Sequence, residues 1–247
     1  KLDRIAPGTP VTAEMQPLRV QVVAMDWKWL FIYPDHGIAS VNEMAAPVNV
    51  PIEFEITAST VMNAFYVPAL AGMIYAMPAM ETKLHAVINE AGEYEGFSAN
   101  YSGAGFSHMR FKFHGLEGAK FDDWVAQVRA TPAQLGRAEY LALEKPSERE
   151  PVRHYGQTMT GLFDAVVNLC VEPTQMCMKD MMALDAQGGL GLANVYNVAR
   201  LRYDTERRRG TGLLPPDAYV TALCAVEPEQ MATASNAPLY GPRRLAP

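Results

Sequence analysis

Residues 19–33, RVQVVAMDWKWLFIY, contain two β signals in direct succession. Residues 19–25 are rich in β-branched side chains and predict a short strand. Residues 27–33 form an aromatic run that predicts a second strand, and this strand ends at the turn cluster Pro34-Asp35-His36-Gly37. The chain therefore begins, after an extended lead-in over residues 1–17, with a pair of strands.

Similar signals recur over the next 80 residues. Residues 52–56 alternate apolar and charged side chains, which is typical of a half-buried strand. Residues 84–88 predict another strand, and residues 94–98 and 109–113 predict a closing pair. Many short strands with closely spaced turns indicate an all-β sandwich with Greek-key links.

The pattern becomes helical after Gly115. Phe121, Trp124, Val125 and Val128 follow the i, i+3, i+4, i+7 spacing of one helix face. The segment Thr131-Pro132-Ala133-Gln134 predicts an N-cap, a first-turn proline and a capping-box partner for a helix that runs to about Lys145. Residues 163–169 predict a third short helix.

These patterns divide the chain into four parts. We expect a lead-in over residues 1–17, a sandwich domain over 18–116, a small helical extension over 117–171, and an unassigned tail over 172–247.

Composition and charge limit the possible functions. The chain has 247 residues and a formal net charge of -6, which argues against nucleic-acid binding across its surface. No run approaches the ~20 apolar residues that span a bilayer, and the first residues do not resemble a signal peptide. We therefore expect a soluble protein or a soluble part of one.

The order of motifs resembles subunit II of the haem-copper oxidases in its quinol-oxidase form. Residues 25–34 resemble its aromatic strand, and residues 61–68 resemble the segment that carries the first copper ligand in cytochrome c oxidases. Residues 98–109 resemble the copper-ligand loop, and residues 74–80 are typical of the quinol branch. The aromatic residues of the helical extension, Phe121, Trp124 and Phe163, resemble the extension that follows the domain in that branch.

The resemblance implies a cupredoxin fold and allows the copper site to be tested residue by residue. The cytochrome c oxidase pattern of two cysteines, a histidine and a methionine falls on Ser98, Ser102, Phe106 and Met109, and the upstream histidine falls on Asn63. Only Met109 keeps a copper-binding side chain. Because a serine hydroxyl cannot replace a bridging thiolate, the resemblance and the chemistry both predict no binuclear copper and no other cofactor in this chain.

By resemblance, the chain is the periplasmic domain of subunit II of a proton-pumping quinol:oxygen oxidoreductase, on the outer side of the bacterial inner membrane. The family usually carries two transmembrane helices before this domain, so the complete protein is expected to be membrane-anchored. Haems and copper are expected in the catalytic subunit I, beside which this non-catalytic subunit has a structural and assembly role. Its expected partners are subunit I and the other oxidase subunits, and neither cytochrome c nor nucleic acid.

Aromatic side chains are the candidates for contact with subunit I. The candidates are Phe65, Tyr66, Tyr75, Tyr101, Trp27 and Trp29, together with Phe106 in the loop. For the two tryptophans, core packing or a role as interface anchors is favoured over an electron-entry patch, because no copper is expected behind them.

Two other functions remain open at this stage. One is a copper-bearing electron carrier, either of the cytochrome c oxidase type or a free cupredoxin. The other is a periplasmic Cu(I)-handling protein that uses the soft ligands Met176, Cys177 and Met178. This segment can equally be an apolar helix face or a disordered stretch.

The remaining histidines, cysteines and arginines have structural alternatives. His108 and His114 are six residues apart and would share a face of a regular strand, as a metal pair or as hydrogen-bonded histidines. Cys170 and Cys177 can form a disulfide in an oxidising compartment, or lie two turns apart on one helix, whereas Cys224 leaves an odd thiol. Residues 207–209, three arginines, are expected to be solvated or to contact anionic lipid headgroups.

Overall fold

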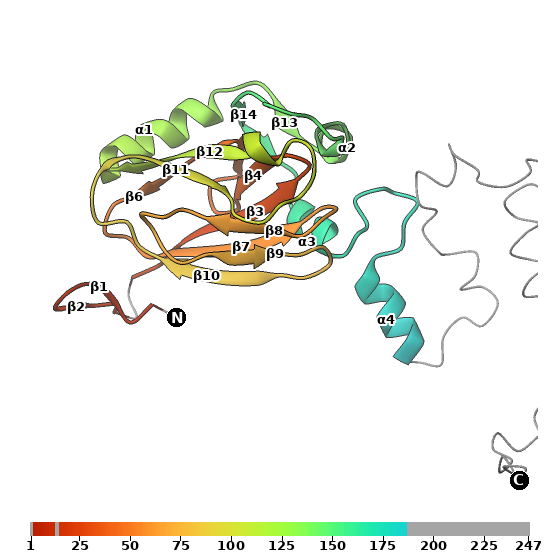
Figure 1. The fold of residues 1–247 in the computed structure, drawn as a ribbon, viewed down its shortest axis with the longest axis horizontal. Helices are drawn as coiled ribbons and strands as arrows, with labels where there is room; N and C mark the ends of the chain where they lie inside the picture. The colour runs from red at the N-terminus through yellow and green to blue at the C-terminus, as the bar shows by residue number, and fades with distance from the viewer. Residues whose placement is uncertain (1, 13–14, 187–247) are drawn as a thin grey trace, which may run out of the picture. The chain divides into compact units, whose positions relative to one another are not determined.

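The computed structural model describes residues 2–12 and 15–186, and most of the described chain forms two β-sheets that face each other (Figure 1). The six strands of sheet 1 are, in order across the sheet, β10 (Thr82–Ala86), β7 (Ile52–Ala58), β3 (Leu18–Met25), β4 (Lys28–Tyr33), β5 (Ile38–Val41) and β14 (Arg153–Tyr155). The five strands of sheet 2 are β6 (Glu43–Pro47), β12 (Arg110–Leu116), β11 (Gly92–Ser98), β8 (Asn63–Tyr66) and β9 (Ile74–Ala76). Two short pairs lie outside these sheets, β1 (Arg4–Ala6) with β2 (Thr9–Pro10) and β13 (Gln134–Leu135) with β15 (Gln157–Thr158).

The strand connections are of the Greek-key type. β3 pairs with β7 in parallel and β6 pairs with β12 in parallel, so strands far apart in the sequence become neighbours. The expected closing pair, β11 with β12, is antiparallel. The predicted fold class is confirmed: the protein is an all-β, cupredoxin-like sandwich with a few additional helices.

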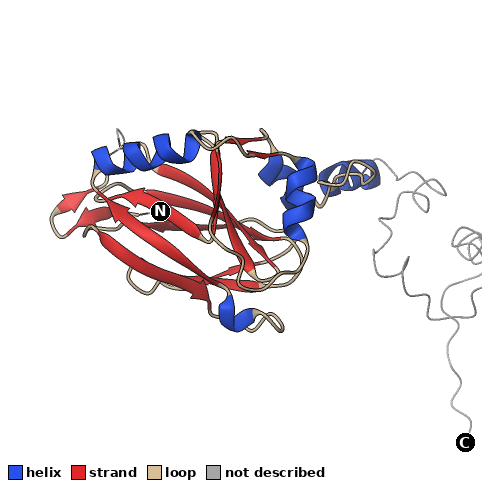
Figure 2. Ribbon diagram, turned by 90° about the horizontal axis from the view of Figure 1, so that it is seen from above, coloured by secondary structure: helices blue, strands red, loops and turns tan. Residues whose placement is uncertain are grey.

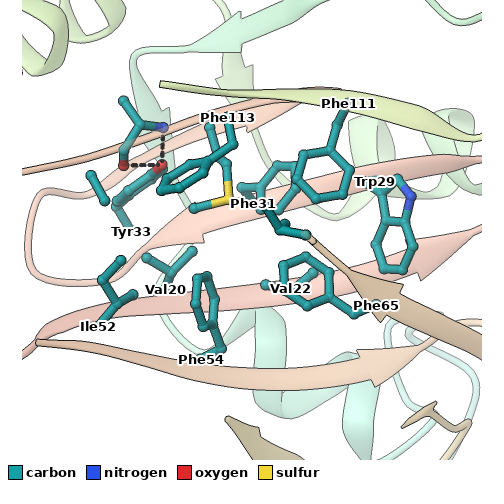
Figure 3. Packing of buried hydrophobic residues seen from close by; sticks show 14 of the residues in the cluster. Val20, Val22, Trp29, Phe31, Tyr33, Ile52, Phe54, Phe65, Phe111 and Phe113 are labelled. Atoms are coloured by element: carbon teal, nitrogen blue, oxygen red, sulfur yellow. Dashed lines mark hydrogen bonds between the residues drawn. The ribbon is translucent and has the colours of Figure 1, made fainter. Parts of the chain in front are cut away.

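The strand β4 is buried along its whole length because both of its faces are covered. Trp29, Phe31 and Tyr33 point between the two sheets, as Figure 3 shows, and belong to the first core cluster. Leu30 and Ile32 point to the opposite face and belong to a second cluster. This explains why residues 29–33 form an unbroken apolar and aromatic run instead of the alternating pattern of a half-exposed strand.

Aromatic rings fill the first core between the sheets. The rings of Phe65 and Phe111 stack with their centroids 5.5 Å apart, and the ring centroids of Phe31 and Phe111 are 4.9 Å apart. Burial of each such side chain stabilises the fold by roughly 1.5–3 kcal/mol. The hydroxyl of Tyr33 donates to the carbonyl of Ala45 and accepts from the same residue's amide, both at 2.9 Å, so this buried polar group is satisfied.

The second core lies between sheet 1 and the helical extension. Its members from the extension include Leu135, Tyr140, Leu143, Phe163 and Val166. Figure 2 shows the helices outside the two sheets. The helices are α1 (Gly118–Arg129), α2 (Arg137–Glu144), α3 (Leu162–Val167) and α4 (Met178–Ala186), with a 3₁₀ turn, η1, at Phe106–His108. β14 comes from the predicted extension yet pairs with β5 at the edge of sheet 1.

Two of the three predicted helices are confirmed and the start of the other one is wrong. α1 buries Phe121, Val125 and Val128 on one face, and α3 forms close to its predicted place. The predicted N-cap at Thr131 is incorrect, because the amide of Thr131 donates to Val128 and belongs to the end of α1. Pro132 follows that end, and Gln134–Leu135 form β13 before α2 begins at Arg137.

No helix in the described part of the chain combines the length and the apolar character that crossing a membrane requires. Residues 187–247 lie outside the described residues. The expectations for Cys224, for the arginines at 207–209 and for most of the 172–247 tail therefore concern a part of the chain that the structure does not describe.

Candidate functional site

The loop of residues 98–109 leaves β11 at Ser98 and returns to β12 after the η1 turn. Its two ends are joined by a hydrogen bond from the amide of Ser98 to the carbonyl of Met109, at 3.2 Å. The side-chain amide of Asn100 donates to the carbonyl of Met62, at 3.2 Å, and connects this loop to the segment that enters β8. The two segments that resemble the copper-ligand segments therefore lie side by side.

Asn63 and Ser98 form a buried hydrogen-bonded pair at the base of the loop. Asn63 is 1% exposed and Ser98 is 3% exposed. The Ser98 hydroxyl donates to Oδ1 of Asn63 at 3.0 Å, and the backbone amide of Ala64 donates to the same hydroxyl at 3.4 Å. The Nδ2 group of Asn63 donates to the carbonyl of Val61 at 3.1 Å. Asn63, at the position of the first copper-binding histidine, and Ser98, at the position of the first copper-binding cysteine, are thus hydrogen-bonded to each other.

The other three aligned copper-site positions are Ser102, Phe106 and Met109, which lie further along the 98–109 loop. The Ser102 hydroxyl lies 4.0 Å from Sδ of the buried Met109. The ring of Phe106 contacts the ring of Tyr101, with centroids 5.6 Å apart. These contacts bring Asn63, Ser98, Ser102 and Met109 together, whereas Phe106 packs against Tyr101. Of the five aligned positions, only Met109 presents a soft donor.

These residues do not fit a binuclear copper centre. Copper at such a site needs bridging thiolates and imidazoles, and a hydroxyl, an amide and a phenyl ring do not replace them. In the part of the chain that the structure describes, no three His, Cys, Asp or Glu side chains come together in an arrangement that could hold a metal ion. The hydroxyl and the amide instead bond to each other, which is what buried polar groups require.

Trp27 covers the loop from the turn between β3 and β4. Its indole Nε1 donates to the carbonyl of Ser102 at 2.9 Å. Its ring leaves no space at Gly105, where an added Cβ would lie 2.5 Å from the ring atom Cδ2. The glycine is required here because the tryptophan ring packs directly on the loop backbone.

Lys28 connects the same turn to the helical extension, which sequence reasoning missed. This residue is 1% exposed, and its ammonium group donates to the carbonyls of Asp26 and Lys145, at 2.9 and 2.8 Å, and to the Ser147 hydroxyl at 2.7 Å. Burial lowers the pKa of this lysine below its usual value. A lysine within an aromatic strand gives no local signal that it is buried.

The two histidines that would share a face of a regular strand are not on one strand. His108 ends the 3₁₀ turn η1, whereas His114 lies in β12. The side chain of His108 contacts Nη2 of Arg149 at 3.2 Å. The turn at Met109 interrupts the alternation between the two positions, and each histidine is hydrogen-bonded to a different partner, as one of the two alternatives had it.

His114 instead shares a carboxylate with a histidine from the extension. Glu43 in β6 is within hydrogen-bonding distance of Nε2 of His154, at 2.6 Å, and of Nε2 of His114, at 3.1 Å. Burial by itself raises the pKa of Glu43, but the two histidine contacts outweigh it and hold the pKa below its usual value of 4.5. Sequence separations of 71 and 111 residues leave no pattern by which this contact could be found.

Two of the aromatic interface candidates lie in the core. Trp29 is 0% exposed and Phe65 is 1% exposed, and their ring centroids are 5.5 Å apart. Because neither side chain reaches the surface, they cannot contact a partner in this structure, and the expectation is corrected for both.

The remaining candidates are at or near the surface around the 98–109 loop. Tyr75 is 44% exposed and Tyr101 is 74% exposed, whereas Tyr66, Trp27 and Phe106 are partly exposed. Tyr75 pairs with Ala64 across β8 and β9, which places it close to the segment at 61–63. The apolar loop surface, as we call it, comprises Val61, Met62, Tyr66, Tyr75, Tyr101 and Phe106.

Cys170 and Cys177 form a disulfide with their Cα atoms 4.7 Å apart. Cys170 follows α3 and Cys177 precedes α4, so the two are not on one helix. The proposed Cu(I) cluster of Met176, Cys177 and Met178 therefore lacks its thiolate in this structure, since the Cys177 sulfur is bonded to Cys170.

Comparisons with known proteins agree with this arrangement. A family profile described as the COX Aromatic Rich Motif matches residues 129–174. Cytochrome bo(3) ubiquinol oxidase subunit 2 of Pseudomonas putida is 48% identical over 165 residues, which are 67% of this chain and 52% of the relative. Ubiquinol oxidase subunit 2 of Acetobacter aceti is 49% identical over 163 residues, covering 65% and 53%. The chain spans about half the length of the curated relatives it matches.

A solved structure is also similar. It is the periplasmic domain of subunit II of cytochrome oxidase (CoxB) of Bradyrhizobium japonicum. The two chains are 26% identical with a TM-score of 0.43, over 44% of this chain and 91% of that chain.

Proposed function

Since this chain is homologous to subunit 2 of ubiquinol oxidases, we propose that it is the periplasmic part of subunit II of a proton-pumping quinol:oxygen oxidoreductase and that it carries no redox centre. Quinol delivers electrons within the membrane, so this subunit needs no copper to receive them from a soluble donor. Haems and copper belong to the catalytic membrane subunit in this proposal. The chain then acts in assembly and in covering the membrane subunit. In this proposal residues 18–116 form the sandwich, and the extension over residues 117–171 adds β14 to sheet 1.

The hydrogen bond between Ser98 and Asn63 carries this proposal. A copper-bearing relative would need a thiolate and an imidazole at these two positions, free to bind the metal. Here both side chains are buried and the hydroxyl donates to the amide oxygen. The pair keeps the loop in its folded shape without a metal, which supports a structural role instead of electron transfer.

The apolar loop surface is the proposed contact with the membrane subunit. Val61 and Met62 are each 41% exposed, beside the more exposed tyrosines at 75 and 101. Exposed apolar side chains that gather on adjacent loops mark sites of protein contact in soluble domains. The loop backbone beneath is fixed by Trp27 and by the bond between Ser98 and Met109, so the surface is preorganised for binding.

The disulfide supports the proposed location on the periplasmic side of the bacterial inner membrane. Stable disulfides form in oxidising compartments such as the bacterial periplasm and are rare in the cytosol. The bond between Cys170 and Cys177 lies in the extension that follows the sandwich.

Co-purification with the membrane subunit tests the docking surface. We expect Tyr75→Glu and Tyr101→Glu, introduced together in the complete subunit, to abolish recovery of the complex through a tag on the membrane subunit. Met182→Glu in α4 is the matched control, because Met182 is 65% exposed and lies outside the apolar loop surface. An unchanged yield of complex from the tyrosine variant, with both variants folded by circular dichroism, would contradict the proposed docking.

A further inference from the structure

The side chains of α4 (Met178–Ala186) that the structure describes are partly or fully exposed. The amide of Met178 donates to the carbonyl of Asn168 at 2.9 Å, and the amide of Lys179 donates to Oδ1 of Asn168 at 3.3 Å. The covalent connection nearby is the disulfide between Cys170 and Cys177. The position of α4 therefore depends strongly on this bond.

Cys170 is the fixed end of the disulfide. It is 3% exposed and belongs to the second core cluster. Its amide donates to the carbonyl of Ala165 at 2.9 Å, and the guanidinium of Arg137 donates to the carbonyls of Cys170 and Val171, at 3.3 and 3.0 Å. These bonds remain when the sulfur–sulfur bond is broken, so Cys170 stays in place.

Cys177 is the movable and more accessible end. It is partly exposed and packs against the second core cluster, and its carbonyl accepts the amides of Asp180 and Met181, at 2.9 and 3.0 Å, which start α4. These partners lie within the same segment, so they move together with it. An incoming thiolate reaches the sulfur of Cys177 more readily than that of the buried Cys170.

We propose that the Cys170–Cys177 disulfide is a thiol–disulfide exchange site whose reduction by a dithiol releases α4 (Met178–Ala186) from the domain. A thiolate of the dithiol attacks Sγ of Cys177, the bond between the two cysteines breaks, and Cys170 leaves as a thiolate and takes up a proton. The second thiol of the dithiol then displaces Cys177, which is also protonated. Two electrons and two protons pass from the dithiol to the protein, and the dithiol becomes a disulfide.

Hydrogen exchange with dithiothreitol as the dithiol tests this site. The protein carries Cys224→Ser so that only one cysteine pair remains, and alkylation with mass spectrometry confirms its redox state. We expect reduction to speed amide exchange in residues 178–186 by on the order of tenfold or more, with no change in α3 or in the strands of the sandwich. The double variant Cys170→Ser/Cys177→Ser should show the fast exchange with or without dithiothreitol.

Three results would overturn the proposal. The first is free thiols at Cys170 and Cys177 in the protein isolated under oxidising conditions. The second is equal exchange of residues 178–186 in the oxidised and reduced forms. The third is faster exchange throughout the sandwich after reduction, which would mean that the disulfide stabilises the whole fold and does not control one segment.

Discussion

Substitution of Ser98 by alanine removes the hydroxyl that occupies a bridging-cysteine position and isolates the Oδ1 atom of Asn63. Both residues are buried, at 3% and 1% exposure, so water does not replace the lost donor. A buried acceptor left without a partner costs ~1–3 kcal/mol, and we expect about 2 kcal/mol here, which is a ~30-fold change in the folding equilibrium. Urea unfolding followed by tryptophan fluorescence measures this free energy.

A double-mutant cycle separates the hydrogen bond from the rest of the change. Asn63→Leu keeps the shape of the side chain and removes the acceptor, so the double variant removes both partners of this hydrogen bond. We expect a coupling free energy of about 1 kcal/mol between the two substitutions. As a control, Ser107→Ala on the exposed part of the same loop should change the free energy of unfolding by less than about 0.5 kcal/mol. Additive effects at positions 63 and 98 would refute the view that these residues act as a bonded pair.

Three further substitutions test other contacts. Because its folded-state pKa is lowered, Glu43 adds stability that is present above its usual pKa of 4.5 and is lost as pH falls through the lowered value. Glu43→Gln should therefore flatten the pH dependence of the urea midpoint below that usual pKa, whereas an unchanged slope would contradict this assignment. Gly105→Ala should destabilise the fold by about 1–3 kcal/mol in thermal melts because its Cβ meets the Trp27 ring, whereas Gly118→Ala, with open space around it, should not. Lys28→Met should cost about 2–4 kcal/mol in urea unfolding, since three acceptors lose the buried ammonium, and a neutral result would show that they find other donors.

Much of the fold is predictable from local pattern. The strands at residues 18–25, 28–33 and 52–58 have strong β signals, and the spacing of Phe121, Val125 and Val128 gives one helix face. These elements are visible because their periodicity reflects which face is buried. The start of α2 was not predictable in the same way, since Pro132 suits the residue after one helix as well as the first turn of the next.

Other strands depend on tertiary pairing and have no local signal. β6, with the sequence Glu-Met-Ala-Ala-Pro, is poor in β-forming residues and is placed by its parallel pairing with β12. β14 has three residues and is fixed by β5. The shared carboxylate of Glu43 depends on both of these strands, and so it could not be found before the fold was known.

The candidate site was predictable in identity and not in geometry. Alignment by resemblance gave the positions Asn63, Ser98 and Met109, and the structure places them together. The sequence did not reveal the hydrogen bond between Asn63 and Ser98. It also suggested surface roles for Trp29 and Phe65, although both lie in the core. Aromatic residues have similar sequence signals in a core and at an interface, and only their burial separates the two.

Copper binding by the purified chain tests the central claim most directly. The protein is incubated with copper, excess metal is removed, and the metal content and visible absorption spectrum are measured. We expect no stoichiometric copper and no thiolate charge-transfer band, because Ser98 and Asn63 bond to each other. Two copper ions per chain with an intense visible band would contradict the account and assign an electron-transfer role. Firmly held colourless Cu(I) would contradict it in favour of copper handling by the segment around Met176.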